Sequence, residues 1–331
     1  MGTVYTVRAA HASASALAGL EQEIRSRLEE INAAMSVYRS KSEISRFNTL
    51  AAGGAMAVSE DFDRVVRVCL EVHAVTGGAF DPTVKPLLDL WGFGSGSIHS
   101  GTWRPPFEES VHHAMTAVGM DLVDASVPGR LGKRHPNVQM DLGAVAKGYA
   151  VDALAELLER RGIDDYLVDI GGDLRVSGRN QEGQRWRIGV NQPLRKQAWD
   201  DVLLVLRPAD KAVLTSGDYR QFFEHEGRYF SHVLDPRTGF PPENDMASVT
   251  VIADSATFAD ALATGLMVLG LKYGLALVET LPGVEALFLV RTIDGGLRDS
   301  RSSGFDRAAG LEAAGPPHSA SGQGELVRAG A

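Results

Sequence analysis

The second half of the chain carries a series of short strand patterns, and this series limits the fold more than any other feature. The segment "YLVDIGGDLRVSG" predicts two strands joined at a glycine turn. Further strands are predicted in "RWRIGV", "VLLVLR", "AVLTSG", "RYFSHVLD", "ASVTVIA" and "EALFLVR". Neighbouring strands with short connections favour antiparallel pairing, and only a few helices interrupt them. The sequence therefore predicts an α+β fold rather than a doubly wound parallel sheet.

The predicted helices differ in how they begin and end. Apolar residues recur at helical spacing from Leu17 to Ile31 after a first strand in "GTVYTV". A second helix is predicted to start after Ser59, which can cap the free amides, and to stop at residues 77–78, both glycine. Later helices are predicted in "MDLGAVAKGYAVD" and its continuation to Gly162, in "SATFADALATGLMVLG", and from Lys272 onward.

Composition excludes several classes of protein. The chain has 331 residues, 44% of them hydrophobic, which is enough to form a substantial core. A net charge of -9 argues against a broad nucleic-acid surface, and a single cysteine, Cys69, excludes an intramolecular disulfide. No export signal and no run of about 20 uninterrupted apolar residues is found, so we expect no transmembrane segment and, for the chain as given, a cytoplasmic location. Residues 307–331 are rich in Ala, Gly, Ser and Pro, and we expect them to be disordered.

The segment "MDLGAVAKGYAVD" could bind an anion. Gly143 lets a ligand approach the backbone, and the helix predicted near Ala146 presents unpaired amides there. Lys147 would add a positive charge beside a phosphate. The spacing of a Walker P-loop is absent, because the residue after Lys147 is Gly148. An ordinary turn between a strand and a helix, with a surface lysine, is an equally good interpretation of these residues alone.

Two further segments carry candidate chemistry. Asp260 and Thr264 lie four residues apart in "SATFADALATG", so on a helix they share one face. Their oxygen atoms, with a loop carbonyl such as that of Ala144, suit Mg²⁺ or Ca²⁺, although an internal hydrogen bond is the simpler explanation. His232 in "YFSHVLDPRTGFP" is a candidate general base, and "DIGGD" reads first as a tight turn and second as a binding loop.

Six segments in a fixed order together resemble a known family. They are "MSVYRSKSEISRFN", "GAFDPTVKPLLDLWGFG", "MDLGAVAKGYAVD", "DIGGDLRVSG", "FSHVLDPRTGFP" and "ADALATG". In this order they are similar to the ApbE family of FAD:protein FMN transferases. The resemblance covers residues 1–306 as one domain and leaves out residues 307–331.

The resemblance implies both a fold and a reaction. The fold would be a T-fold-like single domain of antiparallel sheet with packed helices. The reaction would transfer FMN from FAD to a threonine or serine hydroxyl of a target protein, with Mg²⁺ and with release of AMP. Family members are often exported or anchored at the cell envelope, which leaves the localisation open.

The resemblance also implies site residues, matched position by position. Lys147 and His232 would be catalytic, with His232 as the base. The metal would be held by the Ala144 carbonyl and the side chains of Asp260 and Thr264. The residues expected to bind FAD are Met35, Tyr38, Asn48, Ala79, Phe80, Asp81, Asp141, Lys147 and His232.

Two alternatives use the same site. An Mg²⁺-dependent FAD pyrophosphatase would let water attack the diphosphate and give FMN and AMP. A non-catalytic FAD-binding protein would store the nucleotide, but it would have no need of Asp260 and Thr264.

Overall fold

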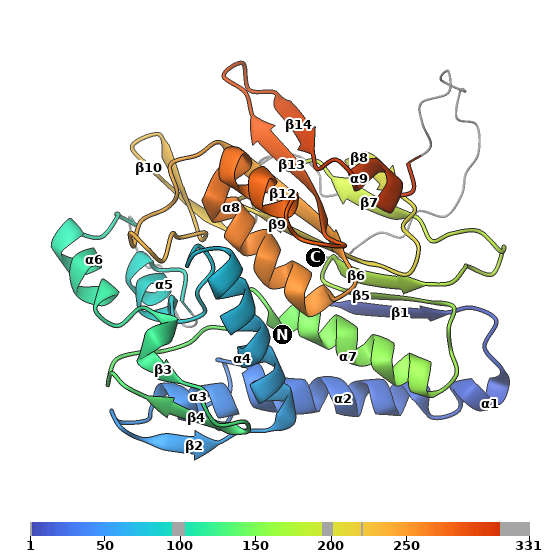
Figure 1. Ribbon diagram of the computed structural model, residues 1–331, viewed down its shortest axis with the longest axis horizontal. Helices are drawn as coiled ribbons and strands as arrows, with labels where there is room; N and C mark the ends of the chain where they lie inside the picture. Colours follow the sequence, from blue (N-terminus) through green and yellow to red (C-terminus); the bar gives the residue numbers. More distant parts are fainter. Residues whose placement is uncertain (1, 95–102, 194–200, 220, 312–331) are drawn as a thin grey trace.

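A seven-stranded antiparallel sheet organises the chain. The computed structural model describes residues 2–94, 103–193, 201–219 and 221–311. The strand order is β1-β5-β6-β9-β12-β13-β14, and each neighbouring pair is antiparallel. This arrangement confirms the predicted α+β class (Figure 1).

The elements have the following bounds in chain order. The helices are α1 (Ala14–Leu17), α2 (Leu20–Met35), α3 (Glu43–Asn48), α4 (Glu60–Val75), α5 (Lys85–Trp91), α6 (Glu108–Met115), the 3-10 turn η1 (Met120–Leu122), α7 (Ala146–Arg160), α8 (Ala256–Val278) and α9 (Phe305–Ala308). The strands are β1 (Tyr5–Ala9), β2 (Ala55–Ala57), β3 (Val123–Asp124), β4 (Arg130–Lys133), β5 (Tyr166–Ile170), β6 (Asp173–Ser177), β7 (Ile188–Asn191), β8 (Val202–Leu206), β9 (Ala212–Gly217), β10 (Phe222–His225), β11 (Arg228–Ser231), β12 (Met246–Ala253), β13 (Glu285–Arg291) and β14 (Leu297–Arg301).

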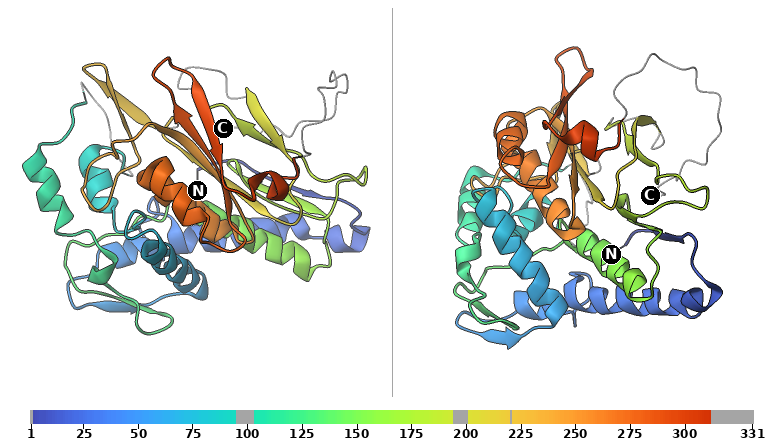
Figure 2. Two further views of the ribbon diagram at one scale, coloured as in Figure 1. Left: turned by 45° about the horizontal axis from the view of Figure 1, so that its top comes forward. Right: turned by 45° about the vertical axis from the view of Figure 1, so that its right-hand side comes forward.

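One face of the sheet is covered by helices. α7 and α8 lie directly on it, and α2 and α4 pack against them from outside (Figures 1 and 2). The main core forms between these layers and includes Cys69, which is fully buried as a small apolar side chain. The helices thus bury the alternate apolar residues of the strands, such as Leu214 and Val251.

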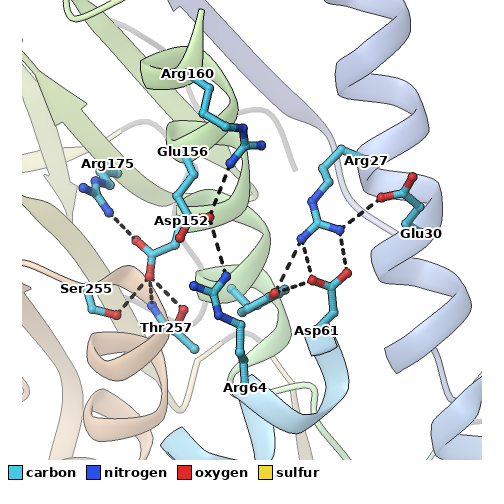
Figure 3. A network of polar contacts seen from close by, with 11 residues as sticks. Arg27, Glu30, Asp61, Arg64, Asp152, Glu156, Arg160, Arg175, Ser255 and Thr257 are labelled. Carbon is cyan, nitrogen blue, oxygen red and sulfur yellow. Dashed lines mark hydrogen bonds and ion pairs between the residues drawn. The ribbon is translucent and has the colours of Figure 1, made fainter. Parts of the chain in front are cut away.

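Each of the two central helices caps the other. The Asp260 carboxylate of α8 accepts a hydrogen bond from the Gly148 amide in the first turn of α7, at 2.9 Å. In return, the Asp152 carboxylate of α7 accepts from the amides of Ala256 and Thr257 at the start of α8, at 3.0 and 2.8 Å. Figure 3 shows Asp152 held also by Arg175, Ser255 and Thr257. Because the first amides of a helix have no partner within the helix, this exchange fixes the register between α7 and α8.

Gly148 allows this close approach. A Cβ atom at this position would lie 2.3 Å from the Ala256 carbonyl oxygen and 2.7 Å from the Asp260 Cβ. No side chain fits into that space without moving backbone.

The opposite face of the sheet has a smaller cover. The ribbon β7–β8 and the short helix α9 pack there over a second core that contains Trp186, Phe305 and Ala309. Phe305 and Ala309 are fully buried. The domain boundary predicted at residue 306 therefore falls inside α9, and the packed chain continues at least to Ala309. Residues 312–331 lie outside the described residues, so the disorder expected for them stays a prediction.

A third cluster lies at the end of the molecule that carries α5 and α6. Trp91, Trp103, Phe223, Phe230 and Phe240 pack there with the hairpin β10–β11. The Trp91 indole donates a hydrogen bond to the Gly239 carbonyl at 2.9 Å, which ties α5 to the loop after β11. This cluster explains why the stretch with two prolines after residue 80 is rich in aromatic residues.

The observed helix and strand ends refine the sequence predictions. Ser59 caps α4 by accepting from the Phe62 amide, as predicted. Gly270, with φ 70° and ψ 177°, interrupts α8 just before the separate helix expected from Lys272. Strand β11 ends at Ser231, so His232 lies beyond it and not within a strand running to Asp235.

By length and composition α8 could cross a membrane, since it has 23 residues and a mean hydropathy of 1.7. In this fold, however, it lies on the sheet and against α4 and α7, and its buried face carries Asp260. Its apolar character is explained by its place in the core.

Candidate functional site

The loop before α7 begins with a carboxylate that shapes its own turn. Asp141 Oδ1 accepts from the Gly143 amide at 2.7 Å, and the Asp141 amide donates to the Pro82 carbonyl at 2.8 Å. Burial raises the pKa of the Asp141 carboxyl, while the hydrogen bond from Gly143 and the charge of Lys85 act in the opposite direction. The loop around Pro82 and the start of α7 are therefore neighbours, as a shared site requires.

Asn48 fixes the backbone just ahead of this loop. Its Nδ2 donates to the Met140 carbonyl at 2.9 Å, and its Oδ1 accepts from the Met140 amide at 2.8 Å. The buried Lys133 ammonium donates to the Asn48 carbonyl at 2.9 Å. In the free protein both polar atoms of the Asn48 side chain are thus hydrogen-bonded to the Met140 backbone. The expected contact of Asn48 with FAD stays a prediction.

The first turn of α7 and the middle of α8 form the centre of the candidate site. Asp260 is 4% exposed and contacts the Gly148 amide. One turn further along α8, the Thr264 hydroxyl lies 3.1 Å from the Ser216 hydroxyl of β9. The spacing of Asp260 and Thr264 along a helix is confirmed, and both side chains lie where α8 meets the sheet and α7.

Lys147 lies in the same turn of α7 and pairs with a carboxylate from the sheet. Its ammonium forms an ion pair with Asp173, the first residue of β6. The Lys147 side chain is 25% exposed, whereas Asp173 is 1% exposed. Lys147 is therefore held at the edge of the core, and the hypothesis of an ordinary surface lysine does not describe it.

The residues expected to bind flavin from the segment 79–81 are mostly enclosed. Ala79 and Phe80 are buried in the main core. Asp81 is 5% exposed, and its carboxylate accepts from the Thr83 amide, the Thr83 hydroxyl and the Met120 amide, at 2.8, 2.5 and 3.2 Å. His73 Nδ1 lies 3.3 Å from Asp81 Oδ2, and this contact raises the pKa of His73 while burial opposes the shift.

Met35 and Tyr38 differ from each other in exposure. Met35, the last residue of α2, is buried in the main core. Tyr38 is 78% exposed, so its ring is open to a ligand. Their expected contacts with FAD stay predictions.

His232 is placed by backbone and aromatic contacts. Its Nδ1 lies 3.1 Å from the Gln221 carbonyl, and its ring makes an edge contact with Phe93 at a centroid distance of 6.4 Å. A carbonyl can only accept, so Nδ1 carries the proton in this contact. The neutral ring then has its lone pair on Nε2, as a general base needs.

The oxygen set proposed for a metal fits a magnesium ion better than a transition metal. Asp260 supplies a carboxylate, Thr264 a hydroxyl and Ala144 a carbonyl that accepts no hydrogen bond within the described ranges. Mg²⁺ is often held by one or two carboxylates together with water and substrate phosphates. Among the described residues no three His, Cys, Asp or Glu side chains form a metal-binding group, so a zinc-like site is not indicated there.

Three residues at this centre were not among those predicted for the site. Asp173 belongs to "DIGGD", which was interpreted first as a turn, and only the fold shows that it meets Lys147. Ser216 reaches Thr264 because the strand β9 lies under α8, and no local pattern signals that contact. Gly148 was noted only because it breaks the P-loop spacing, whereas its amide binds Asp260.

Comparison with known proteins agrees with this arrangement. The ApbE family model matches residues 1–288. The chain belongs to the ApbE family. A curated ApbE-family relative, the FAD:protein FMN transferase of Vibrio cholerae serotype O1, is 39% identical over 310 residues, which are 92% of this chain and 89% of the relative.

Solved structures of ApbE proteins share the fold. The flavin transferase ApbE of Vibrio cholerae matches with a TM-score of 0.81 and 37% identity, covering 93% of this chain and 96% of that one. The apo form of the Pseudomonas stutzeri flavinyl transferase ApbE matches with a TM-score of 0.82 and 36% identity, covering 93% and 94%. The predicted single ApbE-type α+β fold is thus confirmed.

Proposed function

We propose that this ApbE-family chain is an FAD:protein FMN transferase, which moves FMN from FAD to a threonine or serine hydroxyl of a target protein and releases AMP. The observation that carries the proposal is the hydrogen bond between Gly148 and Asp260. It brings the lysine of one sequence motif beside the Asp and Thr of another, more than a hundred residues away. The names of the curated relatives support the same reaction.

The reaction replaces one phosphorus–oxygen bond by another. The target hydroxyl oxygen attacks the phosphorus of the FMN half of FAD. The bond from that phosphorus to the AMP phosphate oxygen breaks, and AMP leaves. The hydroxyl proton passes to a base, so charge and atoms balance.

Lys147 would oppose the negative charge of the diphosphate. It stands in the first turn of α7, where the helix dipole also favours an anion, although the amides of Ala146 and Gly148 are already bonded to the Leu142 carbonyl and to Asp260. Such fixed positive charge lowers the barrier because it needs no reorganisation when charge moves to the leaving phosphate.

Asp260, Thr264 and the Ala144 carbonyl would hold Mg²⁺, which would neutralise diphosphate charge when bound. The support is the chemistry of the donors, all of them oxygen, and their position beside Lys147. His232 would take the hydroxyl proton through Nε2, since its Nδ1 is engaged with Gln221.

The flavin half of FAD would contact the loop from Asp141 and the region of Met35 and Tyr38, whereas Asn48 would lie toward the adenine half. The exposed ring of Tyr38 supports a direct contact. Ala79, Phe80 and Asp81 are buried, so their part would be to shape the wall of the site from behind.

The proposal is tested by incubating the protein with FAD, MgCl₂ and a target domain that carries a flavinylatable threonine. We expect an FMN mass on the target and an equal amount of AMP. AMP with free FMN and an unmodified target would favour the pyrophosphatase instead. FAD that is bound but unchanged would favour storage.

A further inference from the structure

The Lys147–Asp173 contact joins a predicted site residue to one with no assigned role. Asp173 is 1% exposed, and it reaches Lys147 from the sheet side of α7. A charged pair at the edge of a core is costly to form unless its geometry is well fixed. The surroundings of Asp173 show how that geometry is fixed.

Asp173 stands on a rigid part of the fold. It follows directly on the two-residue turn Gly171–Gly172, whose φ values of 62° and 92° only glycine adopts readily. The Gly172 amide donates to Asp169 Oδ1 at 2.9 Å, and the Gly171 amide donates to the Val4 carbonyl at 3.0 Å. The hairpin tip is thus tied to the residue just before β1, which fixes the backbone from which the Asp173 side chain reaches Lys147.

The second oxygen of Asp173 is unusual. Oδ1 is buried and has no hydrogen-bond partner among the residues that the structure describes, while Oδ2 pairs with Lys147. A buried polar atom without a partner is destabilising, and such atoms are rare in native folds. A purely structural ion pair would be expected to satisfy both oxygens, whereas a residue in a substrate site can receive its second donor with the substrate.

We propose that Asp173 is a positioning residue that holds the Lys147 ammonium at the first turn of α7, in place for the FAD diphosphate. This inference rests on the proposed function. Asp173 acts through Lys147, and its rigid hairpin supplies the fixed point from which the flexible lysine side chain is aimed. Preorganised charge of this kind affects the chemical step more than the binding of substrate.

The experiment is a double-mutant cycle on FAD turnover, read as AMP release. The variants are Asp173→Asn, Lys147→Met and the double variant, each with kcat, KM for FAD and melting temperature. Asp173→Asn should lower kcat about 100-fold with KM changed less than about 3-fold. In the Lys147→Met background the Asp173→Asn change should lower kcat by less than about 3-fold, because the ammonium that Asp173 positions is absent.

Two controls separate positioning from folding. Asp210→Asn changes an exposed carboxylate at the other end of β6 but keeps an oxygen that can accept from the Gly178 amide, so it should retain the wild-type kcat. Asp173→Glu keeps the charge and should recover part of the kcat lost in Asp173→Asn. If Asp173→Asn is too unstable to assay, the test uses Asp173→Glu in its place. The proposal is contradicted if the Glu variant folds and lowers kcat by the same factor in the Lys147→Met background as in the wild type.

The outcomes also distinguish this inference from the proposed function. Losses that multiply in the double variant would overturn the positioning role, whatever the reaction is. AMP release without modification of the target would contradict the proposed transferase activity. The double-mutant cycle could still be measured, because its readout is AMP release. A wild-type protein that releases no AMP contradicts the proposed function and the positioning role together, since the role is defined for FAD turnover.

Discussion

At the scale of single residues, Asp260 has an observed structural role and a proposed role in metal binding, and the two can be separated. Its carboxylate accepts from the Gly148 amide, which is structural, and it is the only charged member of the proposed metal set. Asn at this position keeps an acceptor oxygen for Gly148 but loses the charge. The two tasks should therefore respond differently to substitution.

We expect Asp260→Asn to lower Mg²⁺-dependent FAD turnover by about 100-fold or more while the melting temperature changes little. Asp260→Ala should lose turnover and also stability, because the Gly148 amide is then left without its partner. Turnover across a MgCl₂ titration and thermal unfolding by circular dichroism measure the two effects. Undiminished turnover in Asp260→Asn at low Mg²⁺ would show that the metal is held elsewhere.

At the scale of elements, the contact between α7 and α8 depends on one missing side chain. Gly148→Ala would place a Cβ atom 2.3 Å from the Ala256 carbonyl oxygen, so the helices must separate. We expect a loss of about 1–3 kcal/mol in the free energy of unfolding, measured by urea denaturation. Gly296→Ala in an exposed turn is the control, since its nearest neighbour is the movable Thr292 side chain, and it should stay within about 0.5 kcal/mol of wild type.

A second prediction at this scale concerns the link between α4 and the loop that carries Asp81. His73 pairs with Asp81, and this contact raises the pKa of His73 above its ordinary value. A raised pKa in the folded state means that the pair stabilises the fold fully below a pH of about 6.5, and that this stabilisation is lost as the pH rises through the folded pKa.

Urea denaturation between pH 5.5 and 8.5 tests the link. The free energy of unfolding should fall less steeply with rising pH in His73→Gln than in the wild type. The exposed His113 on α6 offers a matched control, and His113→Gln should keep the wild-type dependence. Identical pH profiles for His73→Gln and wild type would contradict the assignment.

At the scale of the whole molecule, the sequence predicted local secondary structure better than it predicted contacts between residues that are far apart in the chain. The strand series, the Ser59 cap and the spacing of Asp260 and Thr264 are local, so patterns were enough to predict them. The Lys147–Asp173 pair and the Ser216–Thr264 contact depend on the order of strands in the sheet, which local patterns do not encode. Local patterns also do not show that Phe305 and Ala309, on either side of the predicted boundary at residue 306, pack into a core formed by segments far away in the sequence.

The same assembly of distant segments predicts how ligands affect the fold. The candidate site draws on the loop before α7, the hairpin β5–β6, strand β9 and helix α8, so a ligand that binds there links the layers of the molecule. FAD present at about 100 times its Kd should add about 2.7 kcal/mol to the free energy of unfolding. Part of this gain should require Mg²⁺, because the metal and the diphosphate would share the site. Thermal unfolding by circular dichroism, with FAD in EDTA or in MgCl₂, measures both parts. Asp260→Asn should keep the gain seen in EDTA and lose the additional gain in MgCl₂, whereas an equal Mg²⁺ effect in variant and wild type would place the cation away from Asp260.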